Sequence, residues 1–194
     1  MADALLFLKH FLSHPSQIGS LLPSGPYLVR ALLDGVDFAQ ARTVVEYGPG
    51  TGVFTAEILR RLHPDARFLS IELMDDFYTA LRARYDDPRM TLVKGSAADI
   101  ADILAAHDLP APDAIVSGLP FTSLPDPLVH QILTESCRVL APGGRFLLYQ
   151  YTRYLTGHLD QYFSAIESRW TLRNVPPAFS FVCRHPRIRE TATV

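Results

Sequence analysis

Length, composition and charge already exclude several classes of protein. A chain of 194 residues is large for one domain and small for two, so we expect one hydrophobic core. Apolar residues make up 48% of the chain and charged residues 20%, as in ordinary globular proteins, while the formal net charge of -2 disfavours a surface built wholly for nucleic acid.

The N-terminal stretch MADALLFLKHFLSHPSQIGSLLPSG predicts neither a membrane span nor a signal peptide. Lys9 and His10 interrupt the apolar run that ends at Leu8, well short of the roughly 20 apolar residues that a span requires. Asp3 stands where a signal peptide carries positive charge. We therefore expect a cytoplasmic protein.

Residues 3–13 predict an amphipathic helix, because apolar side chains share one face of a helical wheel and polar ones lie opposite. The apolar face holds Leu5, Phe7, Leu8, Phe11 and Leu12, and the opposite face holds Lys9, His10 and Ser13, with Leu6 among them. A face of this kind either packs on the domain or lies in the plane of a membrane surface.

Strand-like and helix-like segments then alternate along the chain. Short apolar runs predict buried parallel strands at residues 42–47, 66–72, 90–95, 113–118 and 145–151. Helical spacing lies between them, at Phe54, Ile58 and Leu62, at Phe77, Leu81 and Tyr85, and over residues 127–140 before APGG. WTLRNV and FSFVCRH flank PPA as a closing hairpin, so the order predicts an α/β fold with a doubly wound sheet.

A glycine-rich turn, VVEYGPGTGVFT at residues 44–55, follows the first predicted strand. Glycine lets a backbone approach a ligand closely at such a strand-to-helix turn. The spacing G-x-G-x-G, with Pro49 inside it and no phosphate-binding Lys, differs from the dinucleotide pattern. Glu72, at the end of the second strand, can accept hydrogen bonds from both hydroxyls of a ribose. Together these features predict a ligand that contains a nucleoside.

The two cysteines, Cys137 and Cys183, are far apart in the sequence and form no metal-ligand pattern. We expect two buried thiols in a reducing compartment and predict no metal site.

The glycine turn resembles the first motif of the class I S-adenosylmethionine-dependent methyltransferases, and the alternating pattern fits their Rossmann-like sheet. This resemblance implies seven strands, mostly parallel with a C-terminal antiparallel hairpin, preceded by N-terminal helices. It also implies one methyltransferase domain over residues 1–194. Residues 1–35 would be a helical segment and a candidate membrane-contacting lid, and residues 36–194 the catalytic core.

The resemblance further implies which residues would hold S-adenosylmethionine as the cofactor. Its methionine part would lie against the first motif, at Glu46, Gly48, Gly50, Thr51 and Gly52. Glu72 would bind the ribose, with Leu73 against the adenine.

The third motif of the family matches KGSAAD, residues 94–99, where Ser96 or Ala97 would meet the adenine edge. Many members carry Asp at the position of Ser96. The departure leaves two alternatives, a hydroxyl contact from Ser96 or an adenine held by backbone groups alone.

The fourth motif, SGLPF at residues 117–121, separates two subfamilies. The rRNA adenine dimethyltransferases have Asn-Leu-Pro-Tyr there and append a helical RNA-binding domain. Here Ser-Gly replaces the Asn, and the chain ends shortly after the predicted hairpin. The chain is more similar to the bacterial phospholipid N-methyltransferases, in HPSQIGSLLPSG (14–25), in the glycine turn and in SGLPF. The first of these segments adds Ser20 and Ser24 to the cofactor-binding residues.

The implied reaction methylates the amine of phosphatidylethanolamine and its methylated intermediates, towards phosphatidylcholine. We expect Ser117 and the carbonyls of Gly118 and Leu119 to receive the hydrogens of the amine. Ser117 also belongs to the predicted cofactor-binding residues, and Tyr151 to the catalytic ones.

Aromatic faces suit the quaternary ammonium that accumulating methyl groups produce. Of the aromatic residues that could border the site, Tyr27, Phe121 and Tyr151 are the predicted contacts, and Tyr149 and Tyr154 are the others considered. The lipid phosphate requires a cation, for which the sequence offers Arg153, Arg184, His185 and Arg187.

The predicted partners are a phospholipid substrate and an anionic membrane surface, contacted by the amphipathic helix at residues 3–13. This places the protein at the inner face of the cytoplasmic membrane, with nucleic acid unlikely as a partner and no obligate protein partner. Two alternatives remain from the sequence. One is an rRNA adenine or small-molecule amine methyltransferase, and the other is a cofactor-binding protein without catalysis.

Overall fold

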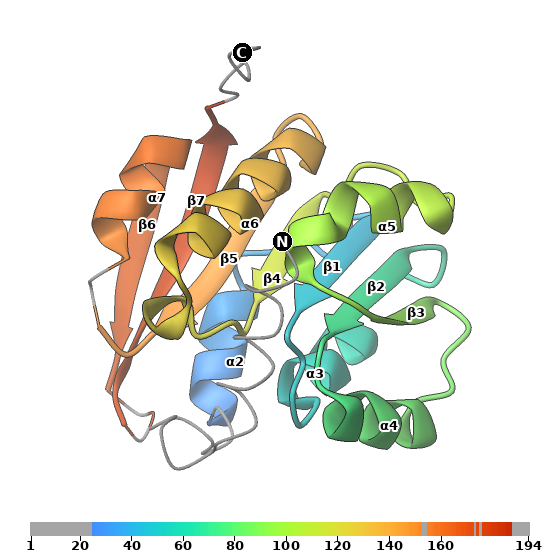
Figure 1. The fold of residues 1–194 in the computed structure, drawn as a ribbon. Helices are drawn as coiled ribbons and strands as arrows, with labels where there is room; N and C mark the ends of the chain where they lie inside the picture. The colour runs from blue at the N-terminus through green and yellow to red at the C-terminus, as the bar shows by residue number, and fades with distance from the viewer. Residues whose placement is uncertain (1–24, 153–154, 173, 175, 188–194) are drawn as a thin grey trace.

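The computed structural model describes residues 25–152, 155–172, 174 and 176–187 (Figure 1). The predicted amphipathic helix at residues 3–13 therefore lies outside the described residues. In chain order the elements are α2 (Pro26–Leu33), β1 (Thr43–Tyr47), α3 (Val53–Arg61), β2 (Arg67–Glu72), α4 (Asp75–Arg84), β3 (Met90–Lys94), η2 (Ala97–Asp99), α5 (Ile100–Ala106), β4 (Ala114–Ser117), η3 (Phe121–Ser123), α6 (Asp126–Val139), β5 (Arg145–Gln150), α7 (Thr156–Tyr162), β6 (Phe163–Thr171) and β7 (Ala178–Pro186).

All of these strands form one sheet in the order β3-β2-β1-β4-β5-β7-β6. The strands β1 to β5 pair in parallel, and β7 runs antiparallel to both β5 and β6. The predicted fold class is thereby confirmed, with seven strands, mostly parallel, and an antiparallel hairpin at the C-terminal end. The strand order reverses between β1 and β4, which is where ligands bind in open α/β sheets.

Helices cover both faces of the sheet (Figure 1). Apolar residues of α2 and α3 pack on one face, against side chains of β1, β2 and β5. Residues of α5, α6 and α7 pack on the other face. The central strand β1 is buried over its whole length because it lies between these two helical layers. The apolar run that predicted it is typical of a parallel strand covered on both sides.

Helix α6 shows how local sequence sets an element. Pro127 occupies its first turn, where a missing backbone N–H costs nothing. Its buried residues recur with helical spacing at Leu128, Val129, Ile132, Leu133, Ser136 and Cys137. The helix ends before the turn at Gly143, whose φ of +80° suits glycine. The predicted range of 127–140 agrees with the observed helix to within one residue at each end.

The first strand of the predicted hairpin was placed wrongly. The sequence predicts it at residues 170–175, whereas β6 spans Phe163–Thr171. It is an edge strand, and Glu167, Ser168 and Arg169 in its middle are exposed, so it lacks the apolar run of a buried strand. Helix α7, which buries only Leu159 and Tyr162, was not predicted for a similar reason.

No described helix has the length and apolar character needed to cross a membrane.

Candidate functional site

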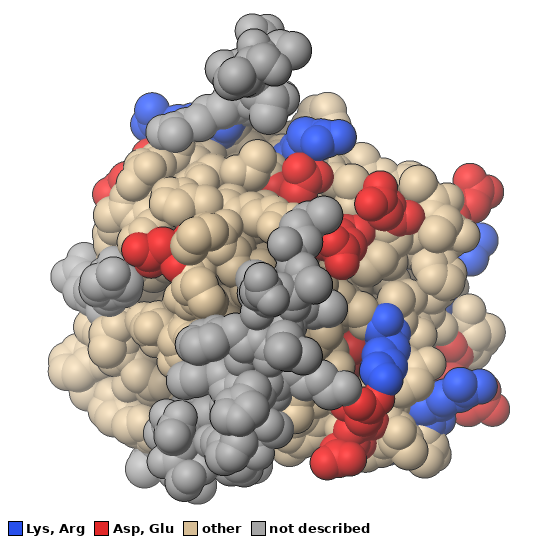
Figure 2. Space-filling view, in the orientation of Figure 1, with Lys and Arg blue, Asp and Glu red and all other residues tan. Residues whose placement is uncertain are grey.

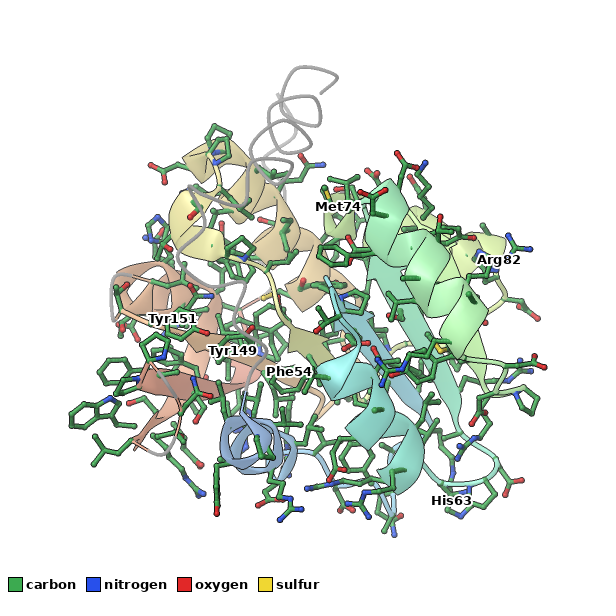
Figure 3. The ribbon with its side chains drawn as sticks, turned by 90° about the horizontal axis from the view of Figure 1, so that it is seen from below. Phe54, His63, Met74, Arg82, Tyr149 and Tyr151 are labelled. Atoms are coloured by element: carbon green, nitrogen blue, oxygen red, sulfur yellow. The ribbon has the colours of Figure 1, made fainter. Side chains whose placement is uncertain are left out.

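The candidate site lies at the carboxyl edge of the parallel strands, beside the point where the strand order reverses (Figure 3). Two loops meet there, the glycine turn after β1 and the 117–121 loop after β4. They lie together because β1 and β4 are neighbours, with Tyr47 level with Ser117.

Three glycines shape the turn after β1. Gly48, Gly50 and Gly52 have φ values of +62°, +54° and +80°, in the left-handed region that other residues adopt at a cost. A Cβ atom at Gly48 would lie 2.9 Å from Leu119, and one at Gly52 would lie 2.8 Å from Leu81. A Cβ at Gly50 would meet nothing within 4 Å. The backbone at Gly50 therefore borders open space.

Glu72 links this turn to the end of β2. The Gly50 N–H donates to its Oε2 at 3.0 Å, and the Met74 N–H donates to its Oε1 at 2.9 Å. The side chain is 4% exposed, and burial raises the pKa of its carboxyl, an effect that backbone donors at Met74, Gly50 and Leu73 oppose. Each oxygen retains a lone pair, so Glu72 can still accept the hydroxyls that the sequence assigned to it.

Glu46, the penultimate residue of β1, carries an unpaired buried oxygen. Its Oε2 accepts from the Thr55 hydroxyl at 2.7 Å and the Ser70 hydroxyl at 3.1 Å, whereas its Oε1 is buried without a hydrogen-bond partner. Burial raises the pKa of Glu46 to about 7, because a carboxylate is poorly solvated in the core. A buried acceptor without a donor is costly, and a ligand that brings a donor would remove that cost.

The residues present fit S-adenosylmethionine. The unpaired Oε1 of Glu46 suits the ammonium of the methionine part, and the open space at Gly50 suits close approach of a ligand to the backbone. Glu72 suits the ribose. The cofactor would supply an activated methyl group at this edge, and these residues would bind and orient it.

The predicted adenine contacts lie at the same edge. Leu73 follows β2 and packs partly buried against the core. Ser96 follows β3, and its buried hydroxyl accepts from the Ala98 N–H at 3.2 Å, capping the 3-10 turn η2. Ala97 is 7% exposed. The Ser96 hydroxyl can still donate its own hydrogen, so both alternatives for the adenine contact stay predictions.

The loop after β4 lies directly against the glycine turn. The Gly118 N–H donates to the Tyr47 carbonyl at 2.8 Å, and a Cβ at Gly118 would lie 2.7 Å from the Gly48 carbonyl oxygen. Only glycine fits here without moving one of the two backbones. Ser117 is fully buried, and its hydroxyl accepts from the Leu119 N–H at 3.3 Å.

A pocket of about 230 Å³ opens beside these loops. It is lined by Gly118, Leu119, Pro120, Thr122, Ser123, Tyr149, Gln150, Tyr151, Thr152 and Pro176. Figure 3 shows Phe54, Tyr149 and Tyr151 in a row. The Phe54 and Tyr149 rings stack with centroids 5.5 Å apart, and the Tyr149 and Tyr151 rings meet edge to face at 6.0 Å.

Some predicted residues line this pocket and others do not. Gly118, Leu119 and Tyr151 line it, as does Tyr149, and burial raises the pKa of Tyr151. Tyr27 is 51% exposed in the first turn of α2 and is not among the lining residues. Ser20, Ser24, Arg153 and Tyr154 lie outside the described residues.

The prediction for Phe121 is wrong. Its ring is 2% exposed and packs edge to face against Phe146 in the core, with centroids 6.4 Å apart. The loop after β4 turns into η3 at this residue, which directs the ring inward. A side chain in that position cannot contact a substrate.

The predictions for Arg184 and His185 as phosphate ligands are also wrong. Strand β7 runs antiparallel to β5, so Cys183 lies level with Phe146 near the start of β5, and the residues that follow Cys183 lie at the opposite edge of the sheet from the pocket. Arg184 pairs there with Glu167, and Arg187 follows at the same edge.

Sequence reasoning missed two polar residues that the fold brings to the site. Gln150 ends β5, is 4% exposed and donates from its Nε2 to the Leu119 carbonyl at 3.0 Å. Asn174 is 2% exposed, accepts from the Gly25 N–H at 2.8 Å and donates to the Pro176 carbonyl at 2.7 Å. The only signal for Gln150 was an amide at the end of an apolar strand.

Residues 44–144 match the family model described as a methyltransferase domain. The chain is 36% identical to an ornithine lipid N-methyltransferase from Singulisphaera acidiphila, over 95% of this chain and 97% of that one. It is 30% identical to the ribosomal RNA small subunit methyltransferase A of Aromatoleum aromaticum, over 63% of this chain and 43% of that one.

Solved structures share the fold at low sequence identity. A precorrin-6y C5,15-methyltransferase from Geobacter metallireducens has a TM-score of 0.69 and 18% identity, covering 86% of this chain and 92% of that one. The O-methyltransferase TomG from Streptomyces achromogenes, solved in complex with SAM, has a TM-score of 0.61 and 17% identity, covering 94% and 89%.

A Rossmann-like sheet with a glycine turn at its switch point and an acidic residue after the second strand defines a nucleoside-binding enzyme class. With the matches above, the chain belongs to the class I S-adenosylmethionine-dependent methyltransferases. S-adenosylmethionine is its cofactor.

We expect Gly50→Ala to weaken binding of S-adenosylhomocysteine by at least tenfold, because the new methyl group enters the open space beside the turn. The left-handed backbone adds a folding cost of about 1–2 kcal/mol. Gly143→Ala is the matched control, since Gly143 has a φ of +80° and also nothing within 4 Å, but lies in the turn before β5, at the opposite edge. Titration calorimetry and thermal melting check both, and equal affinities in the two variants would contradict the assignment.

We expect cofactor binding at pH 6 to release a proton from Glu46. Its pKa of about 7 leaves it mostly protonated in the free protein, and an ammonium beside Oε1 would favour the carboxylate. Calorimetry with S-adenosylhomocysteine in two buffers of different ionisation enthalpy measures the release, which Glu46→Gln should abolish.

The same pKa makes the free protein less stable as pH rises. The folded pKa lies above the ordinary value of 4.5, so stability from this group is complete below pH 4.5 and falls as pH rises through about 7. Denaturant titrations should show this slope in the wild type and a flatter one in Glu46→Gln. Identical slopes would show that Glu46 does not titrate in this range.

Proposed function

We propose that this enzyme methylates the primary amine of a lipid head group, with phosphatidylethanolamine and its methylated intermediates as acceptors. The observation that carries the proposal is the pocket beside the glycine turn. Its described lining consists of one glycine, one leucine, two prolines, three hydroxyl residues, one glutamine and two tyrosines, without a charged side chain. The relationship over nearly full length to an ornithine lipid N-methyltransferase supports a lipid as the acceptor class.

A pocket of this chemistry suits amine methylation. An amine attacks only in its neutral form, and a primary amine is mostly protonated near pH 7. A site without a carboxylate in its wall does not hold the ammonium form, and partial desolvation favours the neutral one. Tyr149 and Tyr151 give the pocket an aromatic wall, which suits the cation that forms as methyl groups accumulate. The remaining task of the protein is to align amine and methyl group.

Two lipid head groups meet these requirements. Phosphatidylethanolamine carries its amine beside a phosphate, and an ornithine lipid carries its amine beside a carboxylate. The shared chemistry is a primary amine on a lipid whose head group is otherwise anionic. Because Arg184 and His185 lie at the opposite edge, the structure offers no described cation for the phosphate in this pocket. Arg153 stays a prediction for that role.

We further propose that the enzyme works at a membrane surface, at the inner face of the cytoplasmic membrane. The large apolar side chains Tyr27, Trp170 and Leu172 are 51%, 59% and 64% exposed. They lie at the edge that carries the pocket, because Trp170 pairs with Phe179, which is level with Gln150 at the end of β5. The Gly25 N–H bond to Asn174 brings the start of α2 to the same place. Contact with a bilayer would cover these side chains while lipid enters.

An rRNA substrate has less support. The chain spans less than half of the rRNA methyltransferase from Aromatoleum aromaticum. In the fourth motif, Ser117-Gly118 replaces the Asn whose side chain would accept the adenine amino hydrogens. On the face shown in Figure 2, Lys and Arg side chains are scattered among Asp and Glu, without a continuous basic stripe among the described residues. Such a stripe is what a phosphate backbone requires.

Methyl transfer to lipid vesicles tests the proposal. We expect labelled methyl groups from S-adenosylmethionine to appear in vesicles that contain phosphatidylethanolamine. Parallel reactions contain ornithine lipid, rRNA or small amines in place of that lipid. If only ornithine lipid is labelled, a lipid remains the acceptor class, but its head group is ornithine and not phosphatidylethanolamine. Labelling of RNA alone would overturn the proposal, and labelling of nothing at any cofactor concentration would favour a binding protein without catalysis.

Replacing both Trp170 and Leu172 with Ser should lower methylation of vesicles by about tenfold or more, since roughly 25 cal/mol per Å² of apolar contact with lipid is lost. Because Trp170 also stacks on Phe179, thermal melting of the variant accompanies the rates. The control is the rate of the same variant on a short-chain lipid that is dissolved as single molecules, below its critical micelle concentration. No membrane contact is needed there, so the variant should methylate this lipid as fast as the wild type. Unchanged rates on vesicles would exclude this surface as a membrane contact.

A further inference from the structure

Gln150 holds a buried amide in the wall of the pocket. It is the last residue of β5, is 4% exposed and lines the pocket together with Gly118 and Leu119. Its Nε2 donates to the Leu119 carbonyl at 3.0 Å. A carbonyl accepts only from the nitrogen of an amide, so this bond also determines which way the Gln150 amide is oriented.

The same bond removes one predicted acceptor. The Leu119 carbonyl oxygen also accepts from the Phe121 N–H at 3.0 Å, so both of its lone pairs are used. The Ser117 hydroxyl is fully buried and accepts from the Leu119 N–H. Neither group can receive a hydrogen from an amine in the pocket, although the sequence predicted both for that purpose.

The oxygen of the Gln150 amide has no such partner. Among the described residues, no hydrogen-bond donor pairs with Oε1. The atom is also not completely buried, because the unpaired side-chain oxygens that are completely buried do not include it. It is therefore reachable from the pocket that Gln150 lines. With Leu119 and Ser117 engaged, Gln150 Oε1 and the Gly118 carbonyl remain as acceptors beside Leu119.

We propose that Gln150 Oε1 binds an N–H of the acceptor amine and thereby turns the nitrogen lone pair towards the methyl donor. This inference rests on the proposed function and names the residue that orients the amine within it. A carboxylate here would hold the charged ammonium, whereas a neutral amide accepts an N–H without favouring the charged form as strongly. Gln150 is distant in the sequence from the fourth motif, but the fold brings its side-chain amide next to that loop.

The reaction step balances without a further group. The nitrogen lone pair forms the new N–C bond, and the S–C bond breaks with its electrons on sulfur. The methylated nitrogen is then an ammonium, which loses a proton to water before the next transfer. The role of Gln150 is to position the amine, and it transfers no proton itself.

The number of N–H bonds on the neutral acceptor falls with each methylation. A primary amine has two, a monomethylamine has one and a dimethylamine has none. An acceptor at Oε1 therefore assists the first transfer most and the third not at all. A residue that only supports the 117–121 loop would affect all three transfers alike.

Single-turnover rates with phosphatidylethanolamine, its monomethyl form and its dimethyl form test this dependence. Gln150→Met keeps the length of the side chain and removes both hydrogen-bonding atoms. We expect the first transfer to slow by about tenfold or more, the second by less, and the third to stay within about twofold of the wild type. Gln161→Met is the matched control, because Gln161 is an exposed residue of α7, and should leave all three rates unchanged.

Gln150→Glu provides a second test, in a variant whose side chain has nearly the same size as that of the wild type. A carboxylate at this place should stabilise the ammonium, so the rate of the first transfer should rise with pH at a higher midpoint than in the wild type. The third transfer starts from a dimethylammonium, which also has one N–H, and should show a similar shift. An unshifted profile in this variant contradicts a contact between residue 150 and the amine.

The outcomes separate this inference from the function on which it rests. A wild-type protein that is inactive on all three lipids overturns the proposed function and this inference with it. Wild-type activity with an equal slowing of all three transfers in Gln150→Met overturns this inference alone. Thermal melting of each variant with S-adenosylhomocysteine accompanies the rates, and a Gln150→Met protein that does not fold leaves the pH profile of Gln150→Glu to decide.

Discussion

The close approach of two backbones at the switch point of the sheet determines the geometry of the site. A Cβ at Gly118 would lie 2.7 Å from the Gly48 carbonyl oxygen, and a Cβ at Gly48 would lie 2.9 Å from Leu119. The glycine turn that faces the cofactor and the loop that borders the acceptor pocket are therefore in direct contact. In the proposed function, this contact would place the methyl donor next to the acceptor, which is most of what such a reaction requires from a protein.

Two buried carboxylates give the cofactor side of the site its electrostatic character. Burial raises the pKa of both Glu46 and Glu72, and the charge of Glu72 raises that of Glu46 further. Glu72 recovers part of the cost from backbone donors, while the Oε1 of Glu46 has no donor at all. The energetic penalty in the free protein thus becomes selectivity for a ligand that brings hydrogen-bond donors and positive charge to this edge.

The acceptor side is different because its described wall is uncharged. Tyr149 and Tyr151 provide aromatic surface, and Gln150 and Gly118 provide acceptors that carry no net charge. The proposed amine would be oriented by hydrogen bonds in such a wall without being held as an ammonium. The division of the site into a charged cofactor side and a neutral acceptor side follows from the sheet, since β1 and β2 form the first side and β4 and β5 the second.

The sequence by itself determined the parts of this protein that depend on local order. Apolar runs predicted the five parallel strands, because a strand buried on both faces needs apolar residues throughout. The glycine spacing and Glu72 predicted the cofactor edge, because turn chemistry and position after a strand are local properties. Even the choice of glycine at position 118 was visible as part of a motif, although its contact with Gly48 was not.

Only the tertiary structure decided which distant residues share the acceptor pocket. The bond from Gln150 to Leu119 joins residues 31 positions apart, and no local pattern indicates it. The direction of β7 decided that Arg184 and His185 lie at the far edge, since an antiparallel strand carries its last residues away from the end of β5. Strand order and direction follow from packing the whole core, and for that reason the residues that contact an acceptor could not be read from the chain alone.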